Sequence, residues 1–232
     1  DITLNRFYAF HYLIPFLLAG LVFVHIVALH KVGSNNPDGI EIKKGPKGNK
    51  WSDDAPRDGV PFHPYFTVKD ILGTVVFLAV FFSIVFFMPE MGGYFIEQPN
   101  YEPANPLKTP EHIAPVWYFT PYYAILRAVP SFWGTQVWGV LAMFAAIAMF
   151  FLLPWLDRSP VKSIRYKGWM FKFWLTLFVI SFIVLGYLGT QPPTTVLTLL
   201  SQIFTVIYFL FFLLMPIYST LDKTKPEPER LT

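Results

Sequence analysis

Apolar residues along this chain form five long blocks, and the charged residues collect between the blocks. A helix needs about 20 consecutive apolar residues to cross the hydrocarbon core of a membrane. None of the five blocks contains Asp, Glu, Lys or Arg. The pattern therefore predicts an all-α integral membrane protein of about five transmembrane helices, over residues 7–29, 71–88, 136–155, 173–188 and 196–218.

The segments that join these blocks alternate between basic and nearly uncharged. The first connection, the third connection and the C-terminal tail hold most of the Lys and Arg residues. The second connection has only Lys108 and Arg127 as basic residues, and the fourth has no charge. Because cytoplasmic loops carry an excess of Lys and Arg, we expect the C-terminus in the cytoplasm and the N-terminus outside.

The second connection, residues 89–135, is long and holds eight prolines. Proline favours turns and extended chain, and long structured loops are usually functional. Within it, the aromatic stretch 115–127 predicts a short helix at the outer membrane surface. We expect two parts: residues 1–70, with the first span and a cytoplasmic loop, and residues 71–232, a four-helix membrane domain that includes the structured outer-side loop.

Composition supports the membrane interpretation and removes several classes of function. Hydrophobic residues make up 54% of the chain and charged residues 14%, against about 25% charged in a typical soluble domain. The formal net charge of +3 is too small to indicate binding to nucleic acid. The absence of cysteine excludes disulfides, thiolate metal sites and cysteine nucleophiles. The chain begins at Asp1, and we expect it to be a fragment or a processed piece.

Three of the five histidines lie on the first span or at its end: His11, His25 and His30. His11 and His25 are 14 residues apart, which at about 100° per residue places both rings on nearly the same face of a helix. The rise of about 1.5 Å per residue separates them by about 21 Å, so that one lies near each side of the bilayer. Haem iron takes axial histidine, and two haems stacked across the membrane fit this spacing.

Two interpretations of this pair remain open from the residues alone. Ionisable side chains inside a membrane are rare and usually functional, which favours haem ligation. The alternative is a pair of neutral histidines that hydrogen-bond to neighbouring groups within a helix bundle. For His30, the alternative is a solvated side chain at the membrane boundary.

Several short motifs follow one another over nearly the whole chain. They are Leu4-Asn5-Arg6-Phe7-Tyr8-Ala9-Phe10-His11, Gly33-Ser34-Asn35-Asn36-Pro37, Pro61-Phe62-His63-Pro64-Tyr65, Lys69-Asp70-Ile71-Leu72-Gly73, Pro115-Val116-Trp117-Tyr118, Tyr123-Ala124-Ile125-Leu126-Arg127 and Leu153-Pro154-Trp155-Leu156-Asp157. In this order they resemble cytochrome b of the ubiquinol–cytochrome c oxidoreductase, the cytochrome bc1 complex, in its bacterial form. That family has eight membrane helices, and the resemblance implies that this chain corresponds to the last five.

The resemblance implies one axial ligand from this chain to each of two b-type haems. His11 would ligate the low-potential haem near the outer face, and His25 the high-potential haem near the cytoplasmic face. In the family, the second histidine of each haem comes from an earlier helix. Ubiquinol oxidised at an outer site then sends one electron to the Rieske iron–sulfur protein and one across the haems to quinone at an inner site, coupled to proton translocation.

Four residues match positions that line the family's inner, cytoplasmic-side site: His30, Ser34, Lys69 and Asp70. Reduction of quinone needs protons at its carbonyl oxygens, and His and Asp are suited to supply them. Without the resemblance, Lys69 and Asp70 read simply as the end of a helix at the membrane boundary.

The family's outer-side quinol site is formed by a segment that matches Pro115, Val116, Trp117 and Tyr118. The commoner family motif has Glu at position 116, and Val cannot accept a proton. We hypothesise that Glu111, the carboxylate nearest in sequence, takes this role and that Tyr123 hydrogen-bonds the quinol. The alternative is that Glu111 is solvated and that water alone carries the proton.

The partners implied by the resemblance are the Rieske protein, cytochrome c1 and the N-terminal half of cytochrome b, in a dimeric complex within the lipid of a bacterial inner membrane. A split, plastoquinol- or menaquinol-using complex divides its helices differently from this chain. From other classes, a proton-coupled secondary transporter needs inverted repeats or broken helices, which the sequence does not show. A non-redox structural subunit leaves the spacing of His11 and His25 unexplained.

Overall fold

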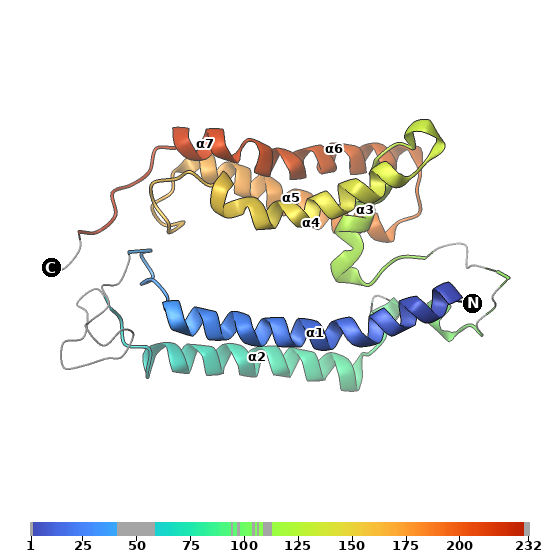
Figure 1. The fold of residues 1–232 in the computed structure, drawn as a ribbon, viewed down its shortest axis with the longest axis horizontal. Coiled ribbons are helices and arrows are strands. Elements are labelled where there is room, and N and C mark those ends of the chain that lie inside the picture. The colour runs from blue at the N-terminus through green and yellow to red at the C-terminus, as the bar shows by residue number, and fades with distance from the viewer. Residues whose placement is uncertain are drawn as a thin grey trace. The chain divides into compact units, whose positions relative to one another are not determined.

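The computed structural model describes residues 2–40, 59–93, 95–96, 98–103, 105, 107–108 and 113–229, and within these residues it contains helices and no strand. Five of its helices are long and apolar enough to cross a membrane, which confirms the predicted all-α membrane fold. The α-helices, in chain order (Figure 1), are α1 (Ile2–Val32), α2 (Tyr65–Phe87), α3 (Thr120–Ala128), α4 (Val137–Leu156), α5 (Trp169–Thr190), α6 (Thr195–Leu213) and α7 (Met215–Leu221).

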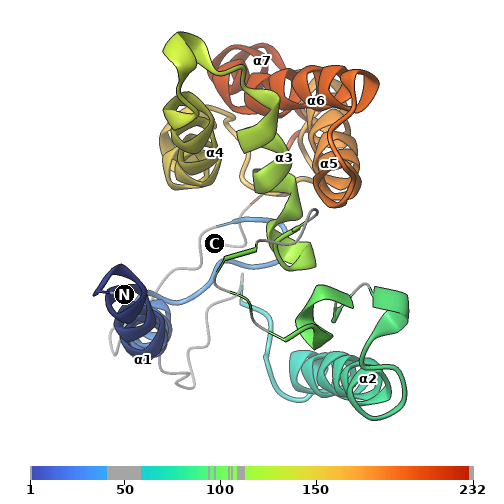
Figure 2. The same ribbon diagram turned by 90° about the vertical axis from the view of Figure 1, so that its right-hand side faces the viewer.

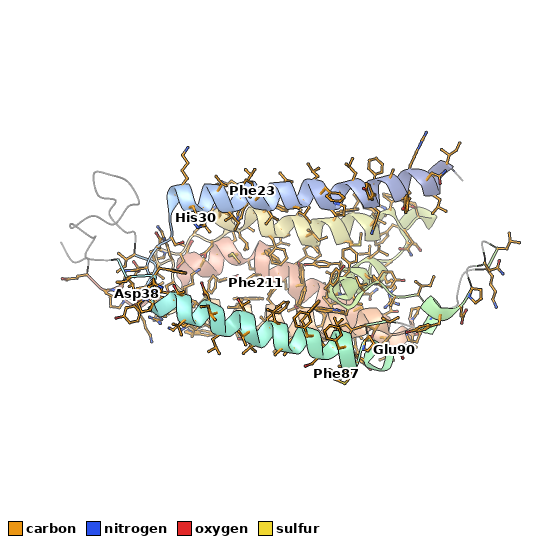
Figure 3. All side chains as sticks on the ribbon, turned by 90° about the horizontal axis from the view of Figure 1, so that it is seen from below. Phe23, His30, Asp38, Phe87, Glu90 and Phe211 are labelled. Atoms are coloured by element: carbon orange, nitrogen blue, oxygen red, sulfur yellow. The ribbon has the colours of Figure 1, made fainter. Side chains whose placement is uncertain are left out.

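The chain divides into two compact units, residues 1–61 with 226–232 and residues 62–225. The first unit contains α1, which is continuous although Pro15 lies inside it. The helix ends before Gly33, whose φ of 84° is left-handed, a conformation that terminates helices. No residue of α1 is buried among the described residues, and Figure 3 shows its side chains standing out around the ribbon. A helix that is apolar all round suits a membrane span.

The second unit begins with α2, which is also apolar all round and has no buried residue. Phenylalanine rings stack along it, with centroids 6.0 Å apart for Phe77 and Phe81. Figure 3 shows Phe87 at its end and Glu90 just beyond. The helix begins at Tyr65, before the uncharged stretch from which we predicted it. Lys69 and Asp70 therefore lie inside its first turns rather than ahead of it.

Helices α3 to α7 form the packed part of this unit (Figure 2). The short helix α3 contacts α4, α5 and α6, and its Ala124 and Ile125 are completely buried. Tyr208 of α6 is completely buried as well, and its hydroxyl donates to the Ala146 carbonyl of α4 at 2.9 Å. The ring thus fills the core while its polar end is hydrogen-bonded, as a buried hydroxyl requires.

Two elements refine the sequence prediction. The short helix predicted over residues 115–127 is present as a 3-10 turn, Trp117–Phe119, followed directly by α3. The last span, predicted as one helix over 196–218, breaks at Leu214 into α6 and α7. Pro216 causes the break, because it has no N–H to continue the helical hydrogen bonds and it lies at the start of α7.

The loop between α4 and α5 is tied to α7 and to the segment that follows it. The carboxylate of Asp222 accepts hydrogen bonds from the N–H groups of Gly168 and Met170 at 2.6 and 3.2 Å. These groups lie at the start of α5, where unpaired N–H donors and the helix dipole favour an anion. The hydroxyl of Ser219 accepts from the N–H of Arg158 at 3.0 Å. Asp222 therefore caps a helix more than fifty residues earlier in the chain.

Replacing Asp222 by Ala is expected to lower the free energy of unfolding by about 1 kcal/mol, the usual cost of losing a helix cap. The N–H groups of Gly168 and Met170 lose their acceptor in this variant. Lys223→Ala is the matched control, because Lys223 is the next residue and its side chain is exposed. Thermal unfolding in detergent, followed by circular dichroism, gives the measurement. Equal midpoints for both variants would show that Asp222 does not stabilise α5.

Candidate functional site

His11 and His25 lie on one uninterrupted helix, α1, and both side chains are exposed. Neither ring has a hydrogen-bond or ion-pair partner among the described residues. An axial bond to haem iron requires an imidazole nitrogen that no other group occupies, so the two side chains fit the predicted role. The described residues contain no group of three or more His, Asp or Glu side chains that would hold a metal ion by themselves.

His30 lies in the last turn of α1, and its Nδ1 donates a hydrogen bond to the carbonyl of Ile26 at 2.8 Å. This bond orients the ring along its own helix. Ser34 is exposed just beyond the helix. The chain then turns at Asn36, whose side-chain oxygen accepts from the N–H of Asp38 at 3.1 Å; Figure 3 labels Asp38 and His30 at this end of α1.

Lys69 and Asp70 are exposed on the first turns of α2. The ammonium group of Lys69 lies 5.5 Å from the centroid of the Phe66 ring, within reach of a cation–π interaction. These two residues belong to the second unit, whereas His30 and Ser34 belong to the first.

The predicted outer segment leads directly into α3. Trp117 makes edge contacts with the rings of Phe95 and Tyr118, whose centroids lie 6.3 and 5.6 Å away. Pro115 is half-buried, whereas Val116 and Tyr118 are 52% and 61% exposed. The segment thus presents an aromatic, mostly exposed surface next to α3.

Glu111 lies outside the described residues, as does His112, so the role of Glu111 stays a prediction. Another carboxylate of this loop, Glu90, follows α2 and accepts a hydrogen bond from the hydroxyl of Tyr101 at 3.0 Å. This hydrogen bond is the main reason that the pKa of Tyr101 lies above its usual value. The loop therefore holds a carboxylate, Glu90, that the sequence prediction did not consider.

Tyr122 and Tyr123 are neighbours on α3 with different surroundings. Tyr122 packs edge-on against Phe182 of α5 with centroids 5.9 Å apart, and burial raises the pKa of its phenol. The ring of Tyr123 is half-buried and lies 4.7 Å from the guanidinium carbon of Arg127, one turn later on α3. Tyr122 therefore packs against the core, whereas the Tyr123 ring contacts the charged side chain of Arg127.

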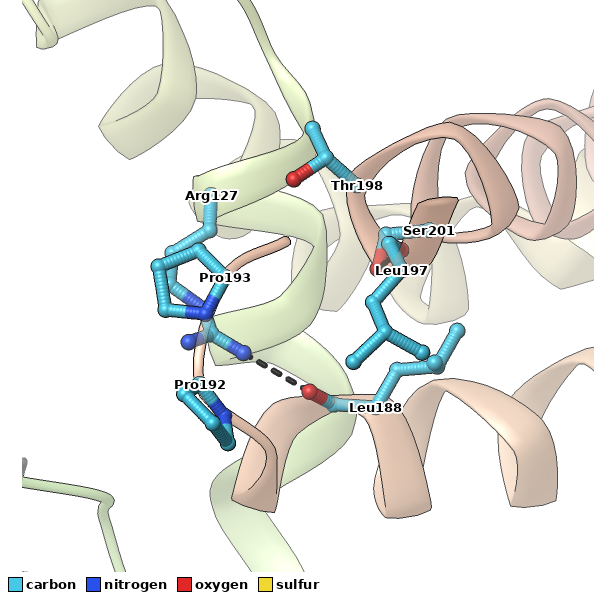
Figure 4. Close-up of a pocket in the computed structure, with 7 residues that line it drawn as sticks. All are labelled: Arg127, Leu188, Pro192, Pro193, Leu197, Thr198 and Ser201. Atoms are coloured by element: carbon cyan, nitrogen blue, oxygen red, sulfur yellow. Dashed lines mark hydrogen bonds between the residues drawn. The ribbon is translucent and has the colours of Figure 1, made fainter. Parts of the chain in front are cut away.

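The residues that fix α3 in place were not predicted from the sequence. Arg127 donates hydrogen bonds to the carbonyls of Leu188 and Gln191 at the end of α5, and Figure 4 shows the bond to Leu188. Gly189 of α5 lets the Thr120 carbonyl of α3 lie against it, because a Cβ at position 189 would overlap that carbonyl. No sequence pattern singles out this contact, because Gly189 acts through the Thr120 carbonyl that faces it in the folded protein.

A groove of about 670 Å³ lies at the opposite end of these helices, between the end of α4 and the start of α5. Its lining is mostly apolar, with Asp157 and Ser159 among its polar residues. Asp157 forms an ion pair with Lys167, and the Ser159 hydroxyl has no hydrogen-bond partner among the described residues. None of the predicted site residues lines this groove.

Two family models match the chain, and both describe the same family. The model described as cytochrome b(N-terminal)/b6/petB matches residues 1–121. The model described as cytochrome b(C-terminal)/b6/petD matches residues 103–209.

Similar proteins and structures carry related names. "Cytochrome b" of Allochromatium vinosum is 70% identical over 232 residues, which are 100% of this chain and 56% of that protein. "Cytochrome b" of Rickettsia bellii is 46% identical over 231 residues, 99% of this chain and 53% of that protein. A solved structure, "Hyperthermophilic respiratory Complex III", is 41% identical with a TM-score of 0.77, over 96% of this chain and 53% of that chain. The chain thus spans about half the length of the relatives that it matches.

Proposed function

Because the chain belongs to the cytochrome b family, we propose that it is the haem-ligating and quinone-handling half of a bacterial cytochrome b subunit. In this role it serves a quinol–cytochrome c oxidoreductase, which oxidises ubiquinol at an outer site and reduces quinone at an inner site, with proton translocation. The observation that carries the proposal is the pair His11 and His25, both exposed on one continuous helix.

His11 and His25 would each hold one b haem through a ring nitrogen, His11 toward the outer side and His25 toward the cytoplasm. The haems supply one-electron carriers that connect the two sides of the membrane. We propose that the second axial ligand to each iron comes from the part of cytochrome b that this chain does not cover. The basic loop between α4 and α5 and the C-terminus then lie on the cytoplasmic side.

A redox difference spectrum of the full-length subunit tests this function. The dithionite-reduced minus oxidised spectrum is expected to show b-type haem bands at about two haems per polypeptide, since each b haem uses a pair of histidines. Protein without these bands would refute the cytochrome function.

At the inner site, His30 and Asp70 are proposed to deliver protons to the quinone oxygens, with Ser34 and Lys69 as hydrogen-bond donors. The Nδ1–H of His30 donates to the Ile26 carbonyl, which orients the ring along the end of α1. Asp70 is exposed, which allows it to exchange protons with water.

His30→Leu and Asp70→Asn are each expected to slow quinone reduction by about tenfold. This is less than the 10²–10⁴ that a single general acid usually contributes, because water and the remaining residue take over part of the proton transfer. Flash-induced electron transfer measures the two sites separately, and quinol oxidation in the same variants is the control. Unchanged rates of quinone reduction in both variants would show that His30 and Asp70 lie at the membrane boundary without taking part in proton transfer.

At the outer site, oxidation of one quinol releases two electrons and two protons, so a proton acceptor is needed. Tyr123 is proposed to hydrogen-bond the quinol, with Pro115, Trp117 and Tyr118 forming the aromatic wall beside it. Val116 cannot accept a proton, and Glu111 is proposed as the acceptor in its place.

Glu111→Gln is expected to lower quinol oxidation by about 10²-fold, the lower range for loss of a general base. Adding Val116→Glu to this variant is expected to restore part of the rate. Glu102→Gln is the control, because Glu102 is an exposed carboxylate of the same loop. Stopped-flow reduction of cytochrome c by quinol gives the rates. A Glu111→Gln rate within about twofold of the parent would leave water as the proton carrier.

The proposed partners are the Rieske iron–sulfur protein, which takes the first electron of each quinol, cytochrome c1, and the N-terminal half of cytochrome b. We propose a dimeric complex embedded in lipid, in which the exposed apolar surfaces of α1 and α2 are covered. Mild-detergent purification of the tagged full-length subunit is expected to bring a two-iron cluster and a c-type haem with it. Their absence from intact complex would contradict these partners.

A further inference from the structure

The guanidinium group of Arg127 binds the end of α5. Its Nη2 donates to the Leu188 carbonyl at 2.7 Å and its Nη1 to the Gln191 carbonyl at 2.9 Å. Because α5 ends at Thr190, both carbonyls lie at its C-terminus, where the helix dipole favours a cation. Figure 4 shows the side chain reaching from α3 to Leu188, with Pro193 beside it.

The same guanidinium group lies against Tyr123. Its central carbon is 4.7 Å from the centroid of the Tyr123 ring, within the distance at which a cation is attracted to an aromatic face. The two residues are four apart on α3, so their side chains share one side of the helix. Arg127 thus connects the Tyr123 ring to a fixed point on α5.

Among the described residues, the guanidinium group of Arg127 has no hydrogen-bond or charge partner other than two carbonyls at the end of α5 and the Tyr123 ring. No carboxylate pairs with it among the described residues, and its Nε is buried without a hydrogen-bond partner. A buried cation costs free energy unless it is neutralised, and even a well-paired one is weak support for a fold. For Arg127, the two carbonyls at the end of α5 offset this cost, and the cation also contacts the Tyr123 ring, so it links that ring to α5.

The backbone of α3 is held by other contacts that do not involve Tyr123. The side-chain amide of Gln202 donates to the Ala128 carbonyl at 3.0 Å, and Thr120 lies against Gly189. Among the described residues, no hydrogen bond or ring stacking holds the Tyr123 side chain apart from its contact with Arg127. The contacts of Gln202 and Thr120 therefore hold α3 without involving the Tyr123 ring, whereas Arg127 contacts both α5 and the ring.

We propose that Arg127 is a positioning residue that orients the ring of Tyr123 toward quinol at the outer site. The proposal rests on the proposed function, in which Tyr123 hydrogen-bonds the quinol. Lysine cannot replace arginine here, because only the planar guanidinium binds two carbonyls and stacks on a ring at the same time.

A double-mutant cycle in the full-length complex tests the proposal, with Arg127→Lys, Tyr123→Phe and the two combined. Tyr123→Phe alone is expected to slow quinol oxidation by about tenfold, and Arg127→Lys by a similar factor. Displacing a group by about 1 Å from its productive position can lower a rate by up to about 10²-fold. If Arg127 acts through Tyr123, Arg127→Lys is expected to change the rate less than twofold when Tyr123 is already Phe.

Gln202→Leu is the matched control, because it removes a bond to α3 without touching Tyr123. The fold-reductions in the quinol oxidation rate caused by Gln202→Leu and by Tyr123→Phe are expected to multiply when the two changes are combined. Haem spectra and quinone reduction at the inner site are expected to stay unchanged in the Arg127 variants, which a general loss of structure would not allow.

The outcomes separate the two proposals. If the fold-reductions of the quinol oxidation rate caused by Arg127→Lys and Tyr123→Phe multiply in the double variant, the positioning role is overturned and the proposed function stays in place. A Tyr123→Phe variant with full quinol oxidation would remove the assigned role of Tyr123 and with it this inference. Arg127→Gln serves where the lysine variant does not assemble. It keeps a donor for Leu188 but no charge over the ring, and the same cycle with Tyr123→Phe decides the question.

Discussion

Haem loss is the expected result when either histidine of α1 is replaced in the full-length subunit. His11→Ala removes the haem nearer the outer side and His25→Ala the haem nearer the cytoplasm, because alanine has no nitrogen to bind the iron. Both side chains are exposed and have no other partner among the described residues, so their loss leaves no hole in the packing of this chain. Electron transfer between the two sides is expected to fall below detection in both variants.

Haem content per polypeptide, measured from the reduced absorbance bands of purified protein, gives the result. His63→Ala is the matched control, because His63 is also exposed but interacts with Thr67 at the start of α2 rather than lying on α1. The control is expected to keep both haems. Full haem content in His11→Ala or in His25→Ala would show that the ligands are assigned wrongly.

Gly189→Ala is expected to reduce quinol oxidation by 10²-fold or more and to lower the yield of folded protein. The new methyl group would overlap the Thr120 carbonyl, so α3 must move away from α5. Overpacking of this kind costs about 1–3 kcal/mol. Because Tyr123 lies on α3, moving α3 also moves Tyr123. A displacement of about 1 Å at a reacting centre costs about 10²-fold in rate.

Gly186→Ala is a matched control on the same helix. A Cβ at Gly186 would lie 3.6 Å from the Cγ of Pro121, an ordinary van der Waals contact. This variant is expected to fold and to oxidise quinol at nearly the parent rate. Thermal unfolding and steady-state quinol oxidation, measured on both variants, decide the matter. Similar results for the two would mean that the contact of Thr120 with Gly189 does not position α3.

The membrane helices were predictable because each has to be apolar over its full crossing. Uncharged stretches in the sequence located the helices α1, α2, α4, α5 and α6. The helix ends were less predictable, since a helix continues past the membrane until its capping groups end it. Lys69 lies inside α2 for this reason, and the break at Leu214 follows from Pro216 rather than from hydropathy.

The placement of His11 and His25 on one helix was predictable from the sequence, but the contacts that hold α3 were not. The spacing of His11 and His25 depends only on helical geometry. By contrast, Arg127 acts on carbonyls about sixty residues later in the chain, and a backbone carbonyl leaves no trace in a sequence. Gly189 belongs to the same class, because its role depends on the residue that faces it in the folded protein.

The hydrogen bonds between the α4–α5 segment and the residues after α7 have a consequence for biosynthesis. Asp222 caps α5, and the N–H of Lys225 donates to the carbonyl of Tyr166 at 2.7 Å. The ribosome synthesises α5 well before Asp222 and Lys225. The first turn of α5 therefore has no cap until α6 and α7 have been synthesised. A stop codon placed directly before Asp222 would therefore release a chain in which all helices are complete but α5 lacks its cap.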